Sequence, residues 1–475
     1  MKKKYIYAFA ALLMWGVSGC ELMSDFDDTN QNPAATTEPI LSALLTNVGA
    51  QLGGYASETR PSLYAQYFSE TQYPEASLYS TPQLSFTGHY SGPLMDLQDI
   101  INRSESNNMT QVARILQQYI FWTVTDRWGD VPYSEALQGN PTPKYDSQEE
   151  IYKGMIATLE EAVNAMDNSP ITGDVIYGGD VAAWKKAANS MRMMMALRLS
   201  LVYPDAGGYA ASQFKAALNH PAGIITTNAE NFDIDYPGGN FPSNWWSLYN
   251  GRNDFAESKT MTDLLATFGD TRQEAFGGAA HAEGNTETSN VGVPYGYKRE
   301  TVTAFTDANT NWARVLRGDF RRQNSTVTLI GAADVTLARA EAADYGWTGE
   351  DLQALYIQGI TQSFQMWGYT PSTSYFTQNG VALTAAAGTG ANLKQIATQR
   401  YIAAYPNGLQ AWSIWRKTGF PALTPAPDAV NSSKQIPTRY VYASSEYTTN
   451  EAAVKAAVAN LPGGDTQDSK VWWDR

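Results

Sequence analysis

Residues 334–367, DVTLARAEAADYGWTGEDLQALYIQGITQSFQMW, contain the strongest fold signal in the chain. Leu337, Ala338 and Ala342 recur at helical spacing before Gly346, a residue type that often ends helices. A second apolar stripe follows, in which small residues alternate with large ones: Leu352, Leu355, Tyr356, Gly359, Ile360, Ser363, Phe364 and Trp367. Two such helices in a unit of about 34 residues predict a tetratricopeptide-like helical hairpin.

Other segments extend this helical pattern. In the hairpin, Asp351 follows Thr348 at capping-box spacing, so we expect the second helix to begin at Thr348. Residues 112–120 and 182–199 each place their apolar side chains on one helical face, and Met193–Met195 are expected to fill the core. The sequence therefore predicts a mainly α-helical protein.

Three long segments between the helices lack helical periodicity: Tyr64–Tyr90, Asn231–Asn250 and Gly277–Asn311. They are rich in residues that favour turns, and they contain many aromatic side chains. Loops of this length in a compact protein are usually functional or disordered. Because a disordered loop has no need of aromatic residues, we interpret these loops as functional.

The N-terminus has the pattern of a secretion signal. Residues 2–4 are lysines, and the apolar run at residues 5–15 is too short to span a bilayer as a permanent helix. Residues 17–19, VSG, then precede Cys20, the one cysteine of the chain, in an arrangement that resembles a bacterial lipobox. We expect cleavage before Cys20, acylation of its thiol and attachment to the membrane through lipid. The alternative is an ordinary signal peptide followed by a buried cysteine.

The segment after Cys20 is polar and acidic. Residues 24–28, SDFDD, resemble a surface-export signal of some two-membrane bacteria, although acidic runs are also common in solvated tethers. We therefore expect a signal peptide at residues 1–19, a lipidated flexible tether at residues 20–39 and a folded domain at residues 40–475.

Charge and motifs argue against several functions. The formal net charge is −14 at pH 7, which argues against binding to the phosphates of nucleic acid. The histidines His89, His220 and His281 lack metal-ligand spacing, and no nucleophile-elbow, phosphate-loop or dinucleotide motif occurs. We therefore expect no catalytic residue, no metal and no cofactor, and a protein that is not an enzyme. A cell-surface all-helical glycoside hydrolase is an open alternative, since its carboxylate pair is defined by distance in space.

A series of motifs runs along the mature chain, at residues 113–116, 126–136 (DRWGDVPYSEA), 184–199, 334–346, 399–402, 407–412, 415–421, 436–437, 446, 450 and 471–474. With these motifs the mature chain resembles the SusD/RagB family of outer-membrane lipoproteins, and its C-terminal part resembles the SusD-like branch. Departures from the branch are Gln410 in place of Glu, Lys417 in place of Arg and Ala443 in place of Pro. Trp412, Trp415 and Arg416 are expected to pack in the core rather than to contact ligand.

The resemblance implies a helical scaffold of tetratricopeptide-like hairpins, with the long irregular loops forming one ligand face. It also implies a location in the outer membrane, facing the cell exterior, and capture of oligosaccharide for a SusC-like TonB-dependent transporter, on which the protein acts as a lid. Some branches of the family bind peptides instead, which leaves a peptide ligand open. A solute-binding lipoprotein would need two α/β lobes, and alternating strand patterns are missing from the sequence.

The candidate ligand-binding residues come from these loops and, for Trp312 and Arg314, from just after the third loop. Aromatic residues make up 12% of the chain, and a flat Trp or Tyr ring stacks on the C–H face of a sugar while Asn and Arg bind its hydroxyls. A loop aromatic without a helical stripe lacks the usual reason to be buried, so we expect exposure. The alternative for the adjacent Trp245 and Trp246 is that one packs in the core and the other points outward. The predicted ligand-binding residues are Tyr73, Tyr79, His89, Asn244, Trp245, Trp246, Tyr249, Asn311, Trp312 and Arg314.

Overall fold

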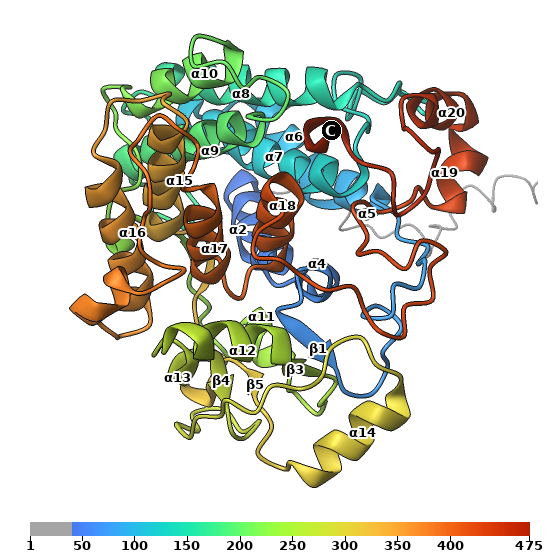
Figure 1. The fold of residues 1–475 in the computed structure, drawn as a ribbon. Helices are drawn as coiled ribbons and strands as arrows, with labels where there is room; N and C mark the ends of the chain where they lie inside the picture. The colour runs from blue at the N-terminus through green and yellow to red at the C-terminus, as the bar shows by residue number, and fades with distance from the viewer. Residues whose placement is uncertain (1–39) are drawn as a thin grey trace, which may run out of the picture.

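The computed structural model describes residues 40–475. The predicted signal peptide, Cys20 and the tether at residues 1–39 lie outside these described residues. The N-terminal half is built from the helices α2 (Leu41–Gln51), α3 (Gly53–Ala56), α4 (Thr59–Tyr64), α5 (Thr87–His89), α6 (Met95–Arg103), α7 (Asn107–Trp128), α8 (Gln148–Ala165), α9 (Val181–Arg198) and α10 (Tyr209–Leu218). Figure 1 shows α6 to α10 gathered on one side of the molecule.

The second half contains further helices: α11 (Asn244–Ser247), α12 (Lys259–Phe268), α13 (Gln273–Phe276), α14 (Arg299–Ala308), α15 (Ala332–Asp344), α16 (Leu352–Met366), α17 (Leu393–Ala403), α18 (Gly408–Thr418), α19 (Ser444–Thr449) and α20 (Glu451–Ala459). Strands are short: β1 (Phe68–Glu70), β2 (Phe232–Ile234), β3 (Phe255–Glu257), β4 (Gly277–Gly278), β5 (Arg314–Val315) and β6 (Val327–Ile330). They pair as β1–β3, β2–β6 and β4–β5, each antiparallel. The expected mainly helical architecture is confirmed. Within residues 40–475, no helix combines the length and apolar character needed to cross a membrane.

The hairpin predicted from residues 334–367 is the pair α15 and α16. The two helices pack closely because α16 presents Gly359 to α15, where an added Cβ would come within 2.6 Å of Leu337 Cγ. Gly346 follows α15 with a φ of 72°, a backbone conformation that glycine adopts without strain. The expected start at Thr348 is wrong: the helix begins at Leu352, because the Asp351 side chain accepts a hydrogen bond from the Ala354 N–H.

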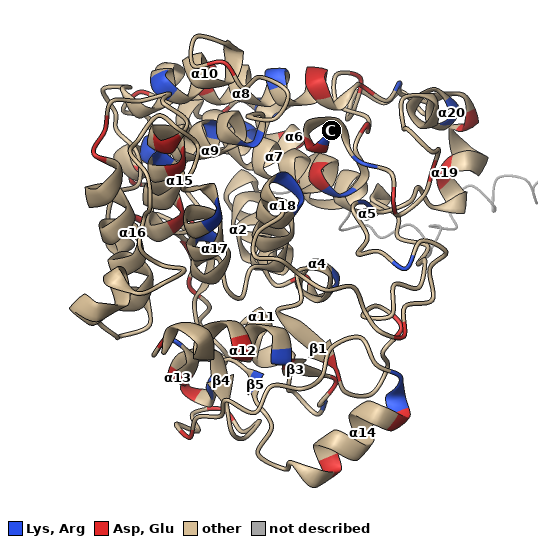
Figure 2. Cartoon of the chain, viewed as in Figure 1, with Lys and Arg blue, Asp and Glu red and all other residues tan. Residues whose placement is uncertain are grey.

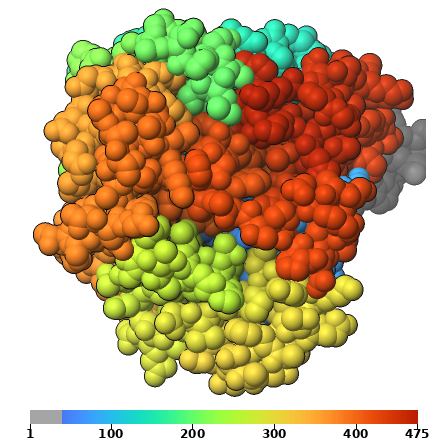
Figure 3. Space-filling view, viewed as in Figure 1, coloured from blue at the N-terminus to red at the C-terminus, as the bar shows by residue number. Residues whose placement is uncertain are grey.

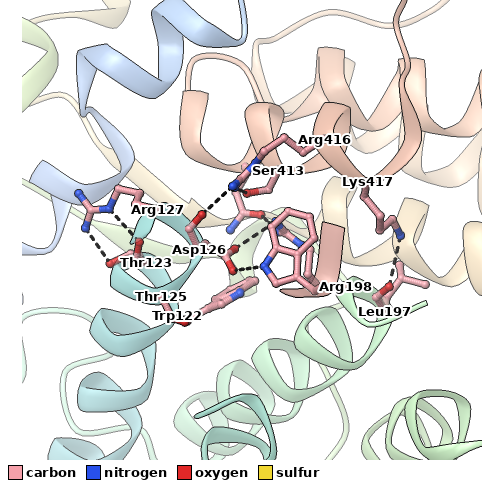
Figure 4. A network of polar contacts seen from close by, with 12 residues as sticks. Trp122, Thr123, Thr125, Asp126, Arg127, Leu197, Arg198, Ser413, Arg416 and Lys417 are labelled. Atoms are coloured by element: carbon pink, nitrogen blue, oxygen red, sulfur yellow. Dashed lines mark hydrogen bonds and ion pairs between the residues drawn. The ribbon is translucent and has the colours of Figure 1, made fainter. Parts of the chain in front are cut away.

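A buried polar network holds several helices together (Figure 4). Asp126, near the end of α7, pairs with Arg198 of α9 at 3.1 Å between Oδ2 and Nη1. The indole N–H of Trp473 donates to Asp126 at 2.9 Å, and the Tyr152 hydroxyl of α8 donates to the same carboxylate. Arg416 of α18 donates to the Asp126 carbonyl at 2.7 Å. One carboxylate residue therefore connects four helices and the C-terminal segment.

Of the C-terminal motif residues expected in the core, Trp412 and Arg416 are buried, and Trp415 is partly buried against the core. The Arg416 guanidinium lies 3.8 Å from the centre of the Trp412 ring, and Trp412 is fully buried. Met193–Met195 of α9 are also buried. A second ionic cluster joins α15, α17 and α18, where Arg400 bonds both Asp334 and Glu341, and Lys417 bonds Glu341. Burial opposes ionisation, but Lys417 and Arg400 hold the pKa of Glu341 at about 2.

A smaller lobe lies below the helices in Figures 1 and 3, formed by α11 to α14 with β1, β3, β4 and β5. A cavity of about 430 Å³ lies where this lobe meets the C-terminal helices. Its walls include Trp245, Phe320 and residues 403–407. The lobe carries two of the three long aromatic segments, so its packing decides where their side chains point.

Candidate ligand-binding site

Two short strands fix the base of the first aromatic loop. Antiparallel pairing places Phe68 of β1 opposite Glu257 of β3, and the Thr71 N–H donates to the Asp254 carbonyl at 2.8 Å. Glu70 ends β1, and its carboxylate accepts the backbone N–H and the hydroxyl of Ser77, each at 2.8 Å. Burial raises the pKa of Glu70 to about 7. The loop is thus tied back to the strand from which it starts.

Tyr79 anchors the same loop from inside. Its side chain is fully buried, with a φ of 65°, and its hydroxyl accepts the Ala426 N–H at 2.9 Å. Next to it, the Leu78 carbonyl accepts the Val430 N–H at 2.8 Å. The expected exposure of Tyr79 is therefore wrong, because the ring is the buried tether between this loop and residues 426–430. Its predicted ligand role stays a prediction.

The segment 426–430 also holds the third aromatic loop. The Asp428 N–H donates to the Gly296 carbonyl at 3.0 Å, and the Asp428 carboxylate accepts the Lys298 N–H at 2.9 Å. Gly296 has a φ of 74°, and a Cβ there would come within 2.5 Å of Ala426 Cβ. A segment more than 100 residues away in sequence therefore clamps both loops at once.

The clamp creates an exposed surface that we call the Tyr73 shelf, a shallow groove of about 280 Å³ lined by Gln72, Tyr73, Pro74, Glu75, Leu78, Lys298, Arg299 and Glu300. Tyr73 is 55% exposed. The Arg299 guanidinium lies 5.8 Å from the centre of the Tyr73 ring and donates to the Gln72 amide oxygen at 3.3 Å. Figure 2 shows basic and acidic residues side by side at the start of α14. An open aromatic face thus lies beside donors and acceptors.

The second aromatic loop is mostly internal. Trp245 is 3% exposed and lines the cavity under the C-terminal helices. Tyr249 is buried, and its hydroxyl accepts the Val315 N–H and donates to the Phe255 carbonyl, both at 2.8 Å. The half-buried Asn244 accepts a hydrogen bond from the Tyr236 hydroxyl at 2.8 Å, and Trp246 is half-buried. The expected exposure is wrong for Trp245 and Tyr249, which pack in the lobe. The ligand role of Asn244, Trp245, Trp246 and Tyr249 stays a prediction.

Trp312 and Arg314 pack against each other. The Arg314 guanidinium lies 3.8 Å from the centre of the Trp312 ring, and Trp312 is 3% exposed. Arg314 Nη1 donates to the carbonyls of Ala279 and Trp312, each at 2.7 Å. The expected exposure of Trp312 is therefore wrong as well, whereas Asn311 is exposed. The guanidinium stabilises the backbone of the lobe, and the ligand role of these residues stays a prediction.

The predicted residues do not form one surface. Tyr73, Trp245 and His89 line three different concavities: the Tyr73 shelf, the cavity at the lobe and a groove beside α5. Inside the lobe, the Tyr249 hydroxyl accepts the N–H of Val315, the residue after Arg314 in β5. Sequence reasoning missed Gln72, Lys298 and Arg299, although aromatic residues in both flanking loops marked the region. Within residues 40–475, no cluster of three His, Cys, Asp or Glu side chains could hold a metal.

Comparison with known families agrees with the helical architecture. Residues 30–443 match the model of the SusD-like family, described as starch-binding and associating with the outer membrane. The chain belongs to this family. The resemblance inferred from the motifs of the sequence is thus confirmed. The sequence has no match among curated proteins.

Solved structures of SusD-like proteins share the fold. A chitin-binding protein is 28% identical, with a TM-score of 0.76 over 92% of this chain and 100% of that protein. A SusD homolog from Bacteroides uniformis is 24% identical, with a TM-score of 0.78 over 92% of this chain and 100% of the homolog. A chitin-binding SusD homolog from Flavobacterium johnsoniae is 23% identical, with a TM-score of 0.79 over 92% of this chain and 98% of the homolog. The last two establish similarity of fold alone.

The DRWGDVP motif of the SusD-like chain has a structural role. Asp126 is the centre of the network in Figure 4, and Trp128 is buried. Gly129 turns the chain with a φ of 89°, and the Asp130 carboxylate accepts the Gln148 N–H at the start of α8. The motif therefore forms the turn that leads from α7 to the start of α8.

Proposed function

We propose that this SusD-like protein is a cell-surface lipoprotein, anchored through Cys20, that captures an oligosaccharide and delivers it to a SusC-like TonB-dependent transporter as its lid. The Tyr73 shelf is the proposed capture site. The observation that carries this proposal is the exposed Tyr73 ring held beside Arg299, because both loops are fixed by backbone bonds rather than by the ligand.

The chemistry of the shelf suits a sugar chain. A pyranose presents C–H groups on one face, which stack on an aromatic ring, and hydroxyls at its rim, which both donate and accept hydrogen bonds. Tyr73 supplies the ring, Arg299 and Lys298 supply donors, and Glu300 supplies an acceptor. The shelf is open, as binding to an internal stretch of a polymer requires.

The family description and the chitin-binding relative suggest which ligands to test first. The family is described as starch-binding, and the structure with 28% identity is described as chitin-binding. Both are neutral polymers of hexopyranose units. We therefore propose a neutral oligosaccharide as the ligand class, with malto- and chito-oligosaccharides as the first probes.

The shelf favours binding over hydrolysis. Glycoside hydrolysis requires two carboxyl groups across the scissile bond, one of them in an environment that keeps it protonated. Glu75 and Glu300 both line the shelf, but both side chains are exposed to solvent. Neither has the desolvated surroundings that a general acid needs.

The decisive experiment is a binding assay with residues 21–475 on insoluble starch and chitin. Tyr73→Ala should reduce retention several-fold, and Phe241→Ala serves as a matched control because Phe241 is an exposed aromatic outside the shelf. Release of reducing ends from either polymer would favour the hydrolase. Equal retention of both variants would reject the shelf as the capture site.

The partnership with a transporter requires its own test. A lid makes a broad contact with the barrel, and contacts of that size survive mild detergent. Purification of the native protein through a C-terminal tag should therefore recover a large outer-membrane β-barrel protein. Recovery of the tagged chain alone would contradict the transporter part of the proposal.

A further inference from the structure

Glu70 is the last residue of β1 and lies at the base of the loop that carries Tyr73. The residue is only 9% exposed. One of its carboxylate oxygens, Oε2, accepts both the backbone N–H and the hydroxyl of Ser77, each at 2.8 Å. These two bonds close residues 70–77 into a ring, which we call the Glu70 loop. The shelf residues 72–75 all belong to it.

The Glu70 loop is fixed at both ends. Pairing of β1 with β3 holds its start, and residues 426–430 hold the chain just after it. Between these anchors, the Ser77 hydroxyl oxygen lies 2.8 Å from Glu70 Oε2 and 3.1 Å from the carbonyl oxygen of Pro74, the residue after Tyr73. One buried side chain therefore joins Glu70 to the backbone that carries the exposed ring.

The surroundings of Glu70 favour a bound proton. Burial raises the pKa of its carboxyl group to about 7, although the Ser77 bonds act in the opposite direction. The titratable side chains that interact electrostatically with this group are Arg60 and Tyr64 of α4, Glu75 of the loop itself and Tyr295 of the third aromatic loop. Arg60 lowers the pKa of Glu70, and Glu75 raises it. Both tyrosines stay neutral near pH 7, because burial raises the pKa of each.

The Ser77 bonds do not require a charged carboxylate. A protonated carboxyl group carries its proton on one oxygen and accepts at the other, so a proton on Oε1 leaves Oε2 able to accept both bonds. If the loop opens, water reaches the carboxyl group and its pKa returns toward the ordinary value of 4.5. Closure therefore takes up a proton between these two values. The resulting stabilisation of the closed loop is complete below pH 4.5 and is lost as the pH rises through 7.

We propose that Glu70 is a positioning residue for Tyr73, and that proton uptake by its carboxyl group links saccharide capture at the shelf to pH. This proposal rests on the proposed function, because it assumes that the Tyr73 shelf binds carbohydrate. The closed loop presents the ring beside Arg299. A ligand that needs this form binds with an affinity reduced in proportion to its population. Saccharide should therefore bind more tightly at pH 6 than at pH 8.

The ligand and the shelf make this dependence easy to assign. A neutral oligosaccharide does not titrate in this range, and no histidine is among the described residues that line the shelf. Isothermal titration calorimetry of residues 21–475 with maltohexaose and chitohexaose at pH 6 and pH 8 measures the effect. The linkage limits the loss of affinity over this range to about tenfold. We expect a several-fold loss in the native chain.

Glu70→Gln is the decisive variant. Its amide oxygen can accept both Ser77 bonds, but the side chain does not titrate. The variant should bind at pH 8 as tightly as the native chain binds at pH 6, whereas Glu70→Ala, which has no acceptor, should bind weakly at both values. Glu287→Gln is the matched control, because Glu287 is an exposed glutamate of the lobe outside the shelf. It should keep the pH dependence of the native chain.

Ser77→Ala tests the same contact from the other side. The Ser77 hydroxyl bond lowers the pKa of Glu70, so its removal should move the midpoint of the curve of affinity against pH to a higher pH. A loss of packing alone would weaken binding without moving this midpoint. Equal melting temperatures of Ser77→Ala and the native chain at pH 6 would show that the variant is folded. A midpoint that does not move in the folded variant would contradict the role of Glu70.

Failure of this proposal is distinguishable from failure of the proposed function. Equal affinity at pH 6 and pH 8, in a chain whose binding still depends on Tyr73, would overturn the link to pH and leave the capture site intact. A native pH dependence in Glu70→Gln would likewise assign the titration to another group and overturn it. Absence of binding to either oligosaccharide and to both polymers at either pH would reject both proposals.

Discussion

The guanidinium of Arg299 lies 5.8 Å from the ring centre of Tyr73, so that two loops far apart in sequence present one exposed surface. The contact is held in place by residues 426–430, which bond to both loops. Since the surface is assembled before any ligand arrives, binding does not have to supply the ordering of either loop.

The contact between Arg299 and Tyr73 should be visible in binding energies. Arg299→Ala and Tyr73→Ala should each weaken oligosaccharide affinity several-fold, at about 1 kcal/mol per side chain, with little change in melting temperature because both residues lie at the surface. The double variant should lose less than the sum of the two, since side chains in contact do not act additively. Isothermal titration calorimetry of the native chain, the two single variants and the double variant completes the double-mutant cycle. If the two losses of binding free energy add exactly, Tyr73 and Arg299 bind the ligand independently.

Trp245 and Trp312 should matter for stability. Both are 3% exposed, and replacement of a buried Trp by Ala costs roughly 3–5 kcal/mol of unfolding free energy through lost packing and a residual cavity. Trp245→Ala and Trp312→Ala should therefore shift the urea midpoint strongly. Phe241→Ala, at an exposed aromatic, should change stability by about 0.5 kcal/mol or less. An unchanged midpoint for both Trp variants would show that the two rings are not core residues.

Glu70 should make stability depend on pH. Its pKa is raised from 4.5 to about 7 in the folded protein, chiefly by desolvation. The folded state therefore binds a proton that the unfolded chain releases between these values, and this stabilisation is complete below pH 4.5 and disappears as the pH rises through 7. The difference is on the order of 3 kcal/mol. In Glu70→Gln, urea unfolding at pH 5 and pH 8 should show a smaller pH dependence than in the native chain. If the native chain and Glu70→Gln show the same pH dependence of stability, a group other than Glu70 is responsible for it.

Asp126 should be one of the most sensitive positions in the helical core. Asp126→Asn removes the charge opposite Arg198 and leaves a buried cation without its partner, which costs about 3–5 kcal/mol. The matched substitution Asp263→Asn breaks an exposed pair with Lys259 on α12 and should cost about 0.5 kcal/mol or less. Chemical unfolding of the two variants gives the comparison. Similar small losses in both would mean that the Asp126 network contributes specificity rather than stability.

Cys20 lies outside the described residues, and its lipidation is testable in cells. Cys20→Ala should move the protein from the membrane fraction to the soluble fraction, because the variant lacks the thiol that is expected to carry the lipid. Surface labelling of intact cells with the native protein tests export separately. Continued membrane retention of Cys20→Ala, in cells that lack the transporter, would contradict the lipid anchor.

Helical periodicity made a large part of the architecture predictable. The spacing of apolar residues in 334–367 predicted α15 and α16, and the stripe at residues 182–199 predicted α9, because helix formation and helix packing depend on neighbours three and four residues apart. The residue that caps a helix is harder to predict, since several residues near the start of a helix can supply the capping side chain. Asp351 caps α16 three residues after the expected Thr348, which shortens the helix without changing its packing.

The order of motifs along the chain determined the family, and with it the expectation of a sugar-binding face. The positions of the loop aromatics depended on the tertiary structure. Tyr73 and Trp245 both stand in loops rich in turn residues, yet Tyr73 projects into solvent while Trp245 lies under the C-terminal helices. Whether a loop side chain is buried depends on contacts with residues distant in sequence. Tyr79, for example, is bonded to Ala426. The spacing of residues within the loop does not predict such contacts. The sequence by itself therefore determined the helical scaffold and the family, whereas the exposed surface was decided by long-range packing.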